Sequence, residues 1–215
     1  MKSLFHFNFN GNLYMSAKLY YIYSTMNASK SALLLMKAYS FEENNIPFIC
    51  MKPSIDNRDG VDVIASRIGI KRDCISIYQE DNIFDIVQEI TNEFQTLLKP
   101  QPKWILVDES QFLTEIQVDQ LSEIVDLLNI NVMCYGLRTD FRTKLFSGSK
   151  RLFELADDVE EIKLSCGCGG KAIINARVDD DNNIVTDGEQ VLIGGNARYV
   201  TMCRKCYKAM INKNF

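Results

Sequence analysis

Hydrophobic and polar positions follow two different periods between residues 17 and 156. Short apolar runs with the length of strands lie at Leu19–Ser24, residues 46–51, residues 74–78, Trp104–Val107 and residues 132–137. Longer segments, with apolar residues three or four positions apart, predict helices at residues 31–45, 82–99 and 114–128. Strands that alternate with helices in this way predict an α/β fold, in which a parallel sheet is flanked by helices on both faces.

The pattern changes near residue 157, where short apolar runs are separated by turns rich in glycine, aspartate and asparagine. These runs lie at residues 159–164, 171–178, 184–185, 190–193 and 199–202. The turn at residues 179–183 predicts a hairpin between the runs on either side of it. We therefore expect a disordered N-terminal extension (residues 1–16), an α/β domain (residues 17–156) and a small β-rich domain (residues 157–215).

The first strand is followed by a polar loop and by Lys30-Ser31, which open an apolar helix. This order is typical of a phosphate-binding loop, because backbone N–H groups of the loop and the helix start point into one concavity. Lys30 would contact the outer phosphates, and the Ser31 hydroxyl would ligate Mg²⁺. The full motif has glycine where this chain has Ser24 and Ser29, so a chance Lys-Ser pair is the alternative. The expected phosphate-binding residues are Ser24, Thr25, Met26, Asn27, Ala28, Ser29, Lys30 and Ser31.

Two adjacent carboxylates, Asp108 and Glu109, follow the apolar run Trp104–Val107. Ligands of parallel sheets bind at the carboxyl ends of the strands, so we expect these acids at the same edge as the phosphate loop. There Asp108 would lie near Mg²⁺, and Glu109 would act as a base or orient a nucleophile. The alternative is a pair of solvated acids at the exit of a strand.

The segment at residues 136–148 mixes basic and aromatic side chains, which are Arg138, Phe141, Arg142, Lys144 and Phe146. A long segment of this composition beside a phosphate site is typical of a lid. The alternative is a surface loop that two phenylalanines anchor.

Four of the 7 cysteines form two close pairs, Cys166/Cys168 and Cys203/Cys206. Because the opening residues do not read as a secretory signal, the pairs predict a metal site rather than disulfides. Tetrahedral Zn²⁺ requires thiolates from two turns brought face to face, and glycines around the first pair allow such a turn. The alternative is four reduced structural thiols.

The composition of the chain limits the kinds of binding partner that we expect. The chain has 215 residues, of which 47% are hydrophobic, and a formal net charge of −4. It contains no basic run, so we expect no nucleic-acid partner. No apolar stretch is long enough to span a bilayer, so we expect no membrane partner.

Five motifs, in their order and spacing, resemble the type II (cytosolic) thymidine kinase family in its bacterial and phage-like branch. They are YSTMNASKS (23–31), VDESQFL (107–113), CYGLRTDF (134–141), IGGNARYV (193–200) and CRKCY (203–207). The similarity extends over residues 17–207. It implies a P-loop (RecA-like) parallel sheet flanked by helices, with a small C-terminal zinc-stapled β-rich lasso domain whose substrate lasso spans residues 190–199.

The resemblance also implies an activity. Family members transfer the γ-phosphate of ATP to the 5′-hydroxyl of thymidine or deoxyuridine, which supplies dTMP for nucleotide salvage and DNA synthesis. The implied cofactors are ATP, Mg²⁺ and a structural Zn²⁺ held by Cys166, Cys168, Cys203 and Cys206. The family further implies a cytoplasmic homotetramer that dTTP inhibits by feedback.

Site residues carry over from the family position by position. Glu109 is the implied general base, and Asp108 belongs to the Mg²⁺ shell together with Ser31. The ATP phosphates are implied to contact Lys30, Ser31, Arg58, Asp108 and Gln111. The implied thymine and sugar pocket consists of Met26, Phe112, Leu137, Phe141, Phe146, Leu192, Ile193, Gly194 and Tyr199.

Ser29 departs from the family pattern, in which glycine nearly always precedes the lysine. If the loop needs a positive φ at this position, a side chain costs about 1–2 kcal/mol. A loss of about 1.4 kcal/mol in transition-state binding is about tenfold in rate. One alternative is therefore a catalytically weakened nucleotide-binding homologue. Another is a general P-loop ATPase with a zinc-ribbon interaction module.

Overall fold

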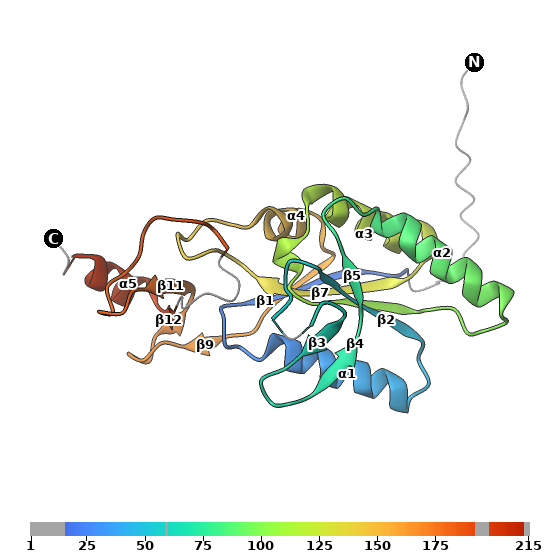
Figure 1. Ribbon diagram of the computed structural model, residues 1–215, viewed down its shortest axis with the longest axis horizontal. Coiled ribbons are helices and arrows are strands. Elements are labelled where there is room, and N and C mark those ends of the chain that lie inside the picture. The colour runs from blue at the N-terminus through green and yellow to red at the C-terminus, as the bar shows by residue number, and fades with distance from the viewer. Residues whose placement is uncertain (1–15, 59, 192–197, 213–215) are drawn as a thin grey trace, which may run out of the picture.

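A six-stranded parallel sheet forms the centre of the computed structural model, which describes residues 16–58, 60–191 and 198–212 (Figure 1). The strands are β1 (Leu19–Ser24), β2 (Phe48–Pro53), β5 (Ile75–Ile77), β6 (Trp104–Val107), β7 (Asn131–Leu137) and β8 (Asp158–Glu161). Their order is β5-β2-β6-β7-β1-β8, and neighbouring strands are parallel. Because helices cover both faces, the inner strands are apolar almost throughout. The expected α/β fold is confirmed.

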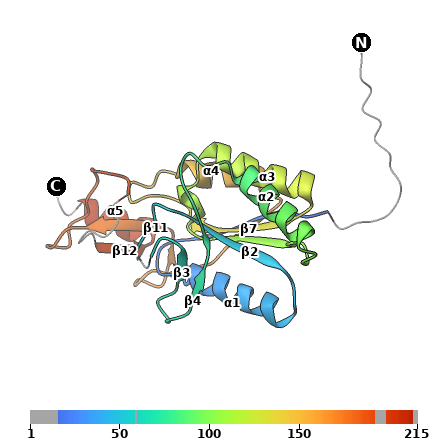
Figure 2. The same ribbon diagram turned by 45° about the vertical axis from the view of Figure 1, so that its right-hand side comes forward.

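Helices lie on both faces of this sheet (Figures 1 and 2). They are α1 (Lys30–Glu43) on one face, and α2 (Ile83–Thr96), α3 (Glu115–Leu128) and α4 (Ser147–Leu155) on the other. Leu34 and Phe41 of α1 pack in one core cluster with Leu106 of the sheet. Val87 and Leu121 belong to the second cluster, on the opposite face. Two separate apolar clusters therefore hold the sheet from both sides.

Local sequence explains where α2 and α3 begin. The Asn82 side chain accepts hydrogen bonds from the backbone N–H groups of Phe84 and Asp85, at 3.0 and 3.3 Å. Thr114 and Gln117 form a reciprocal capping box with two contacts of 3.1 Å. Such caps satisfy N–H groups that the helix itself leaves unpaired. Both helices thus begin within one residue of the positions expected from the sequence.

The C-terminal region forms a smaller unit at one end of the sheet (Figure 1). It contains β9 (Leu164–Ser165), β10 (Lys171–Ala172), β11 (Ile174–Val178), β12 (Arg198–Met202) and α5 (Arg204–Ile211). β9 pairs with β10, and β11 pairs with β12, both antiparallel. A third core cluster, which includes Ala176 and Met202, fills this unit.

The structure differs from the sequence expectations in several elements. β3 (Val63–Ala65) and β4 (Lys71–Asp73) form an antiparallel hairpin in a region for which the sequence predicted no strand. β8 does not join the smaller unit but extends the main sheet beside β1. The expected hairpin at residues 179–183 is present only as a bridge between Val178 and Ile184, because β11 takes β12 as its main partner. α4 and α5 were not expected, and the run at residues 190–193 extends outside the described residues.

Candidate functional site

The loop between β1 and α1 contains two non-glycine residues at positive φ. Ser29 has φ 58° and ψ 27°, and Asn27 has φ 62°, so both lie in the left-handed region. The Ser29 carbonyl accepts the hydrogen bond of the Leu33 N–H at 2.9 Å, which places Ser29 at the start of the helix. The condition for strain at the position of the missing glycine, a positive φ at Ser29, is therefore met. The loop keeps this shape at the expense of strain on an L-residue.

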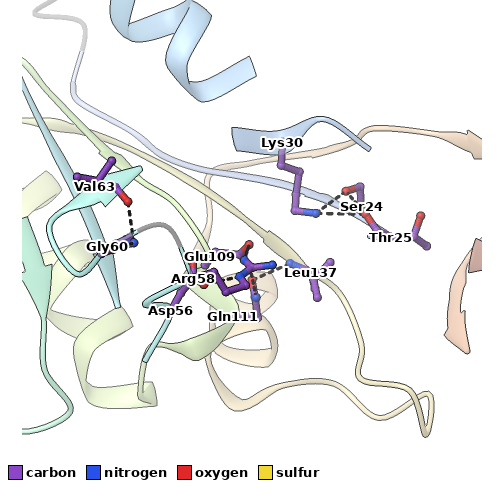
Figure 3. A network of polar contacts seen from close by, with 11 residues as sticks. Ser24, Thr25, Lys30, Asp56, Arg58, Gly60, Val63, Glu109, Gln111 and Leu137 are labelled. Carbon is purple, nitrogen blue, oxygen red and sulfur yellow. Dashed lines mark hydrogen bonds and ion pairs between the residues drawn. The ribbon is translucent and has the colours of Figure 1, made fainter. Parts of the chain in front are cut away.

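Lys30 is buried at the start of α1, with 8% of its surface exposed. Its Nζ donates to Ser24 Oγ at 3.1 Å and to the Thr25 carbonyl at 3.2 Å (Figure 3). Burial lowers the pKa of Lys30, while the carboxylates of Glu109 and Asp108 oppose this shift. Both hydrogen-bond acceptors are uncharged, so the ammonium remains available to an anion that enters beside it.

Asp108 follows β6 and is almost fully buried, with 3% of its surface exposed. Within the described residues, its Oδ1 atom has no hydrogen-bond partner. Burial, and next the negative charge of Glu109, raise the pKa of Asp108 to about 7. A buried carboxylate oxygen without a donor fits a cation ligand, because hard cations such as Mg²⁺ take oxygen ligands. Asp108 and the nearby Ser31 could therefore hold a divalent metal.

Glu109 is held from two sides. Its Oε1 accepts from Nη2 of Arg58 at 2.8 Å, and its Oε2 accepts from Nε2 of Gln111 at 2.5 Å (Figure 3). Gln111 is buried and accepts the Leu137 N–H at 2.9 Å, so it ties Glu109 to the end of β7. Glu109 itself has φ 47°, in the left-handed region. These contacts fix the carboxylate on the cavity wall, where it could accept a proton.

The loop that carries Arg58 is fixed by residues that sequence reasoning missed. Nε of Arg58 donates to Asp56 at 2.6 Å. Lys52 is 2% exposed, and its Nζ donates to the carbonyls of Gly60 and Val63 at 2.8 and 2.7 Å. The available sequence signal was a lysine at the end of an otherwise apolar strand, where a charge must find acceptors.

A cavity of about 670 Å³ joins these groups at the carboxyl ends of β1, β6 and β7. The expected site residues that line it are Met26, Asn27, Ala28, Ser29, Lys30, Ser31, Arg58, Asp108, Glu109, Gln111, Phe112, Leu137, Phe141, Phe146 and Tyr199. Ser24 and Thr25 do not line this cavity and contact it only through Lys30. Leu192, Ile193 and Gly194 lie outside the described residues.

One side of the cavity is aromatic. Phe141 and Phe146 come from the connection between β7 and α4, and they are 1% and 6% exposed. The rings of Phe112 and Phe146 meet edge to face, with centroids 5.7 Å apart. Such a wall suits the flat face of a planar ligand. The cavity is therefore lined by charged side chains and by aromatic side chains.

Sequence reasoning missed Asn175 of β11, which also lines the cavity. Its Oδ1 accepts the Met26 N–H at 2.7 Å, and its Nδ2 donates to the Thr139 carbonyl at 3.2 Å. It thereby ties the phosphate loop to the C-terminal unit. The signal that could have identified it was an amide side chain within Ile174–Val178, a segment in which only Asn175 and Arg177 are polar.

The two cysteine pairs come together in the C-terminal unit. The Sγ atoms of Cys166, Cys168, Cys203 and Cys206 all lie within 4.8 Å of one another. The Sγ atoms of Cys168 and Cys203 are 3.6 Å apart. Four sulfurs at Zn–S distances of about 2.3 Å would be separated by about 4 Å, so this cluster fits a tetrahedral metal.

Comparisons with known proteins agree with this arrangement. The sequence model described as "Thymidine kinase" matches residues 17–207. A thymidine kinase from Mannheimia succiniciproducens is 46% identical over 92% of this chain and 98% of its own length. One from Pasteurella multocida is 47% identical over 91% of this chain and 98% of its own. Among solved structures, a Pif1 helicase from Candida albicans superimposes with a TM-score of 0.42 at 13% identity, over 68% of this chain and 36% of that one, which is too distant to support an argument.

Proposed function

Because this chain belongs to the thymidine kinase family, whose members are phosphotransferases, we propose that it phosphorylates thymidine or deoxyuridine at the 5′-hydroxyl with ATP. The product from thymidine would be dTMP, for nucleotide salvage and DNA precursor synthesis. The observation that carries the proposal is that Lys30, Asp108 and Glu109 line the same cavity as an aromatic wall. Ligand pockets combine apolar and aromatic lining with a few polar groups that fix orientation, and here the charged groups would face the phosphates while the aromatic rings would face the base.

In the proposed mechanism, Glu109 accepts the proton of the 5′-hydroxyl, and the hydroxyl oxygen forms a bond to the γ-phosphorus while the bond from that phosphorus to the ADP oxygen breaks. Lys30 and the backbone N–H groups of the loop stabilise the negative charge on the phosphate oxygens. Asp108 and Ser31 would hold Mg²⁺, which neutralises phosphate charge when bound. Arg58 and Gln111 keep the Glu109 carboxylate in place.

The remaining assignments extend this proposal. We assign the thymine and sugar pocket to the aromatic wall of the cavity and Zn²⁺ to the four-cysteine cluster, which the proximity of the four sulfurs supports. The division into a kinase domain (residues 17–156) and a zinc-binding lasso domain (residues 157–215) is also proposed, although β8 extends the first sheet past residue 157.

Further properties are proposed from family membership alone. They are a homotetramer, inhibition by dTTP and a cytoplasmic location. Within the described part of the chain, the structure contains no helix long and apolar enough to cross a bilayer. None of the findings supports the alternative of a nucleotide-binding homologue with weakened catalysis.

A nucleoside panel tests the proposed reaction. The purified protein with Mg²⁺ and ATP should phosphorylate thymidine or deoxyuridine, and ATP should not be consumed at a comparable rate without a nucleoside. Glu109→Gln should lower kcat by about 10²- to 10⁴-fold, the usual contribution of a general base. Glu123→Gln, at an exposed position on α3, is the matched control and should keep the parent rate. An inactive parent, or a fully active Glu109→Gln variant, would contradict the assignment.

A further inference from the structure

Arg177 is a buried cation that the proposed chemistry does not use. It belongs to β11 and is 5% exposed. Its guanidinium contacts two aromatic rings, a phenolic hydroxyl and a backbone carbonyl, all of which are uncharged. A buried charge is costly unless its surroundings satisfy it, so these contacts define the place of the side chain closely.

The first ring is Phe141, on the aromatic wall of the cavity. The guanidinium carbon of Arg177 lies 3.6 Å from the centroid of this ring. Phe141 lines the cavity, whereas Arg177 is not among the residues that line it. A cation over an aromatic face is attracted to it, most strongly where water is excluded. Arg177 therefore packs against the ring of Phe141 and restrains its position.

The second ring is Tyr199, which also lines the cavity. Nε and Nη2 of Arg177 donate to the Tyr199 hydroxyl at 3.1 and 2.9 Å. Nη2 also donates to the Glu189 carbonyl at 2.9 Å. The planar guanidinium thus fixes the tyrosine and the backbone at residue 189 together, which a lysine with its single ammonium group cannot reproduce with the same geometry.

A neighbouring contact strengthens this arrangement. Asp140, whose side chain is fully buried, accepts from Nε2 of Gln190 at 3.0 Å. Asp140 directly precedes Phe141, and Gln190 directly follows Glu189. The connection after β7 and the chain at residues 189–190 are therefore joined at two adjacent points.

We infer that Arg177 is a positioning residue for the nucleoside, which keeps Phe141 and Tyr199 in the orientation that they present to the cavity. The inference rests on the proposed function, because the base of the nucleoside is the ligand of these two rings. Among the residues that the structure describes, Arg177 contacts Phe141 and Tyr199, which line the cavity, and the Glu189 carbonyl, but neither Lys30 nor Glu109. Loss of Arg177 should therefore weaken nucleoside binding and leave phosphoryl transfer in the bound state nearly unchanged.

Steady-state kinetics of Arg177→Met and Arg177→Lys test the inference. In Arg177→Met, KM and the equilibrium Kd for thymidine should rise about tenfold, which corresponds to about 1.4 kcal/mol. The KM for ATP and kcat at saturating thymidine should stay within about twofold of the parent, because only binding energy common to ground and transition states is lost. The KM and Kd of Arg177→Lys for thymidine should lie between those of the parent and those of Arg177→Met. Arg151→Met, which removes a surface arginine of α4, is the control and should match the parent.

A double-mutant cycle separates positioning from general destabilisation. If Arg177 acts through Tyr199, Tyr199→Phe should weaken thymidine binding in the parent and add little in the Arg177→Met background. Melting curves and metal content identify variants that no longer fold, and then Arg177→Lys and Tyr199→Phe decide the question by the same thymidine readouts. An unchanged thymidine KM in folded variants, or equal losses for thymidine and ATP, would overturn the inference. An inactive parent would instead reject the proposed function first, and the inference would fall with it.

Discussion

Replacement of Ser29 by glycine tests the strained phosphate loop directly. An L-residue in the left-handed region costs about 1–2 kcal/mol, and Ser29 has φ 58°. Glycine avoids this cost but loses about 0.5–1 kcal/mol more conformational freedom on folding. The difference predicts that Ser29→Gly stabilises the protein by about 0.5–1 kcal/mol, which corresponds to a rise of about 1–4 °C in Tm for a chain of this size.

The same substitution elsewhere supplies the control. Ser40 lies inside α1 and is exposed, and glycine is a poorer helix former than serine by about 0.5 kcal/mol. Ser40→Gly should therefore lower Tm while Ser29→Gly raises it. Ser29→Ala keeps the Cβ atom and should not stabilise. Thermal and urea denaturation without nucleotide, on the parent and the three variants side by side, measures these differences.

The effect on activity has an upper limit. If all of the strain at Ser29 were expressed in the transition state, its release would raise the rate about tenfold for each 1.4 kcal/mol. Because the strain is about 1–2 kcal/mol, we expect thymidine phosphorylation by Ser29→Gly to lie between the parent rate and about thirty times that rate. Destabilisation equal to that of Ser40→Gly would refute the reasoning from φ. An inactive parent that Ser29→Gly restores to full turnover would instead identify Ser29 as the cause of a lost activity.

Two further predictions concern Asp108 and the cysteine cluster. Because burial, and next the charge of Glu109, raise the pKa of Asp108 to about 7, the folded protein keeps a proton that the unfolded chain loses above about pH 4. The free energy of unfolding of the parent should therefore fall relative to that of Asp108→Asn as the pH rises from about 5.5 to 7.5. Urea denaturation without Mg²⁺ measures both values. A constant difference between the two proteins over this interval would contradict the raised pKa of Asp108. Metal removal by a chelator, or Cys203→Ser, should lower Tm by several degrees, because a metal that binds only the folded state stabilises that state. If elemental analysis verifies the loss of metal and Tm is unchanged, a structural metal is excluded.

The sequence alone predicted those parts of the site that rest on strong local signals. The apolar run at Trp104–Val107 is a strand because helices bury both of its faces, and Asp108 therefore had to lie at its carboxyl end. The spacing of the cysteine pairs likewise predicted their meeting, which the sulfur positions bear out. In both cases the sequence signal lies within the motif itself, although the partners that complete the structure are distant in the sequence.

The missed elements depend on partners distant in the sequence. β8 (Asp158–Glu161) overlaps the expected run at residues 159–164, but its pairing with β1 as an edge strand of the main sheet was not expected. α4 was missed because its first turn contains Gly148, and glycine is a weak helix former. Only glycine fits at this position, because a Cβ would lie 2.6 Å from the Leu113 carbonyl and 2.8 Å from that of Ser110. β11 prefers β12 to the nearer run at residues 184–185, and no local pattern encodes that choice.

The two loops that carry the proposed chemistry each contain a strained residue, whose backbone depends on contacts with other segments of the chain. Ser29 follows β1 and Glu109 follows β6, and each is a non-glycine residue at positive φ on either side of β7 in the sheet. Such backbone persists only where surrounding contacts outweigh its strain. At Glu109 those contacts are the hydrogen bonds from Arg58 and Gln111, and Gln111 is itself anchored by the N–H of Leu137 at the end of β7. The position of the proposed base is therefore a property of three segments together, and a change in any one of them can release it.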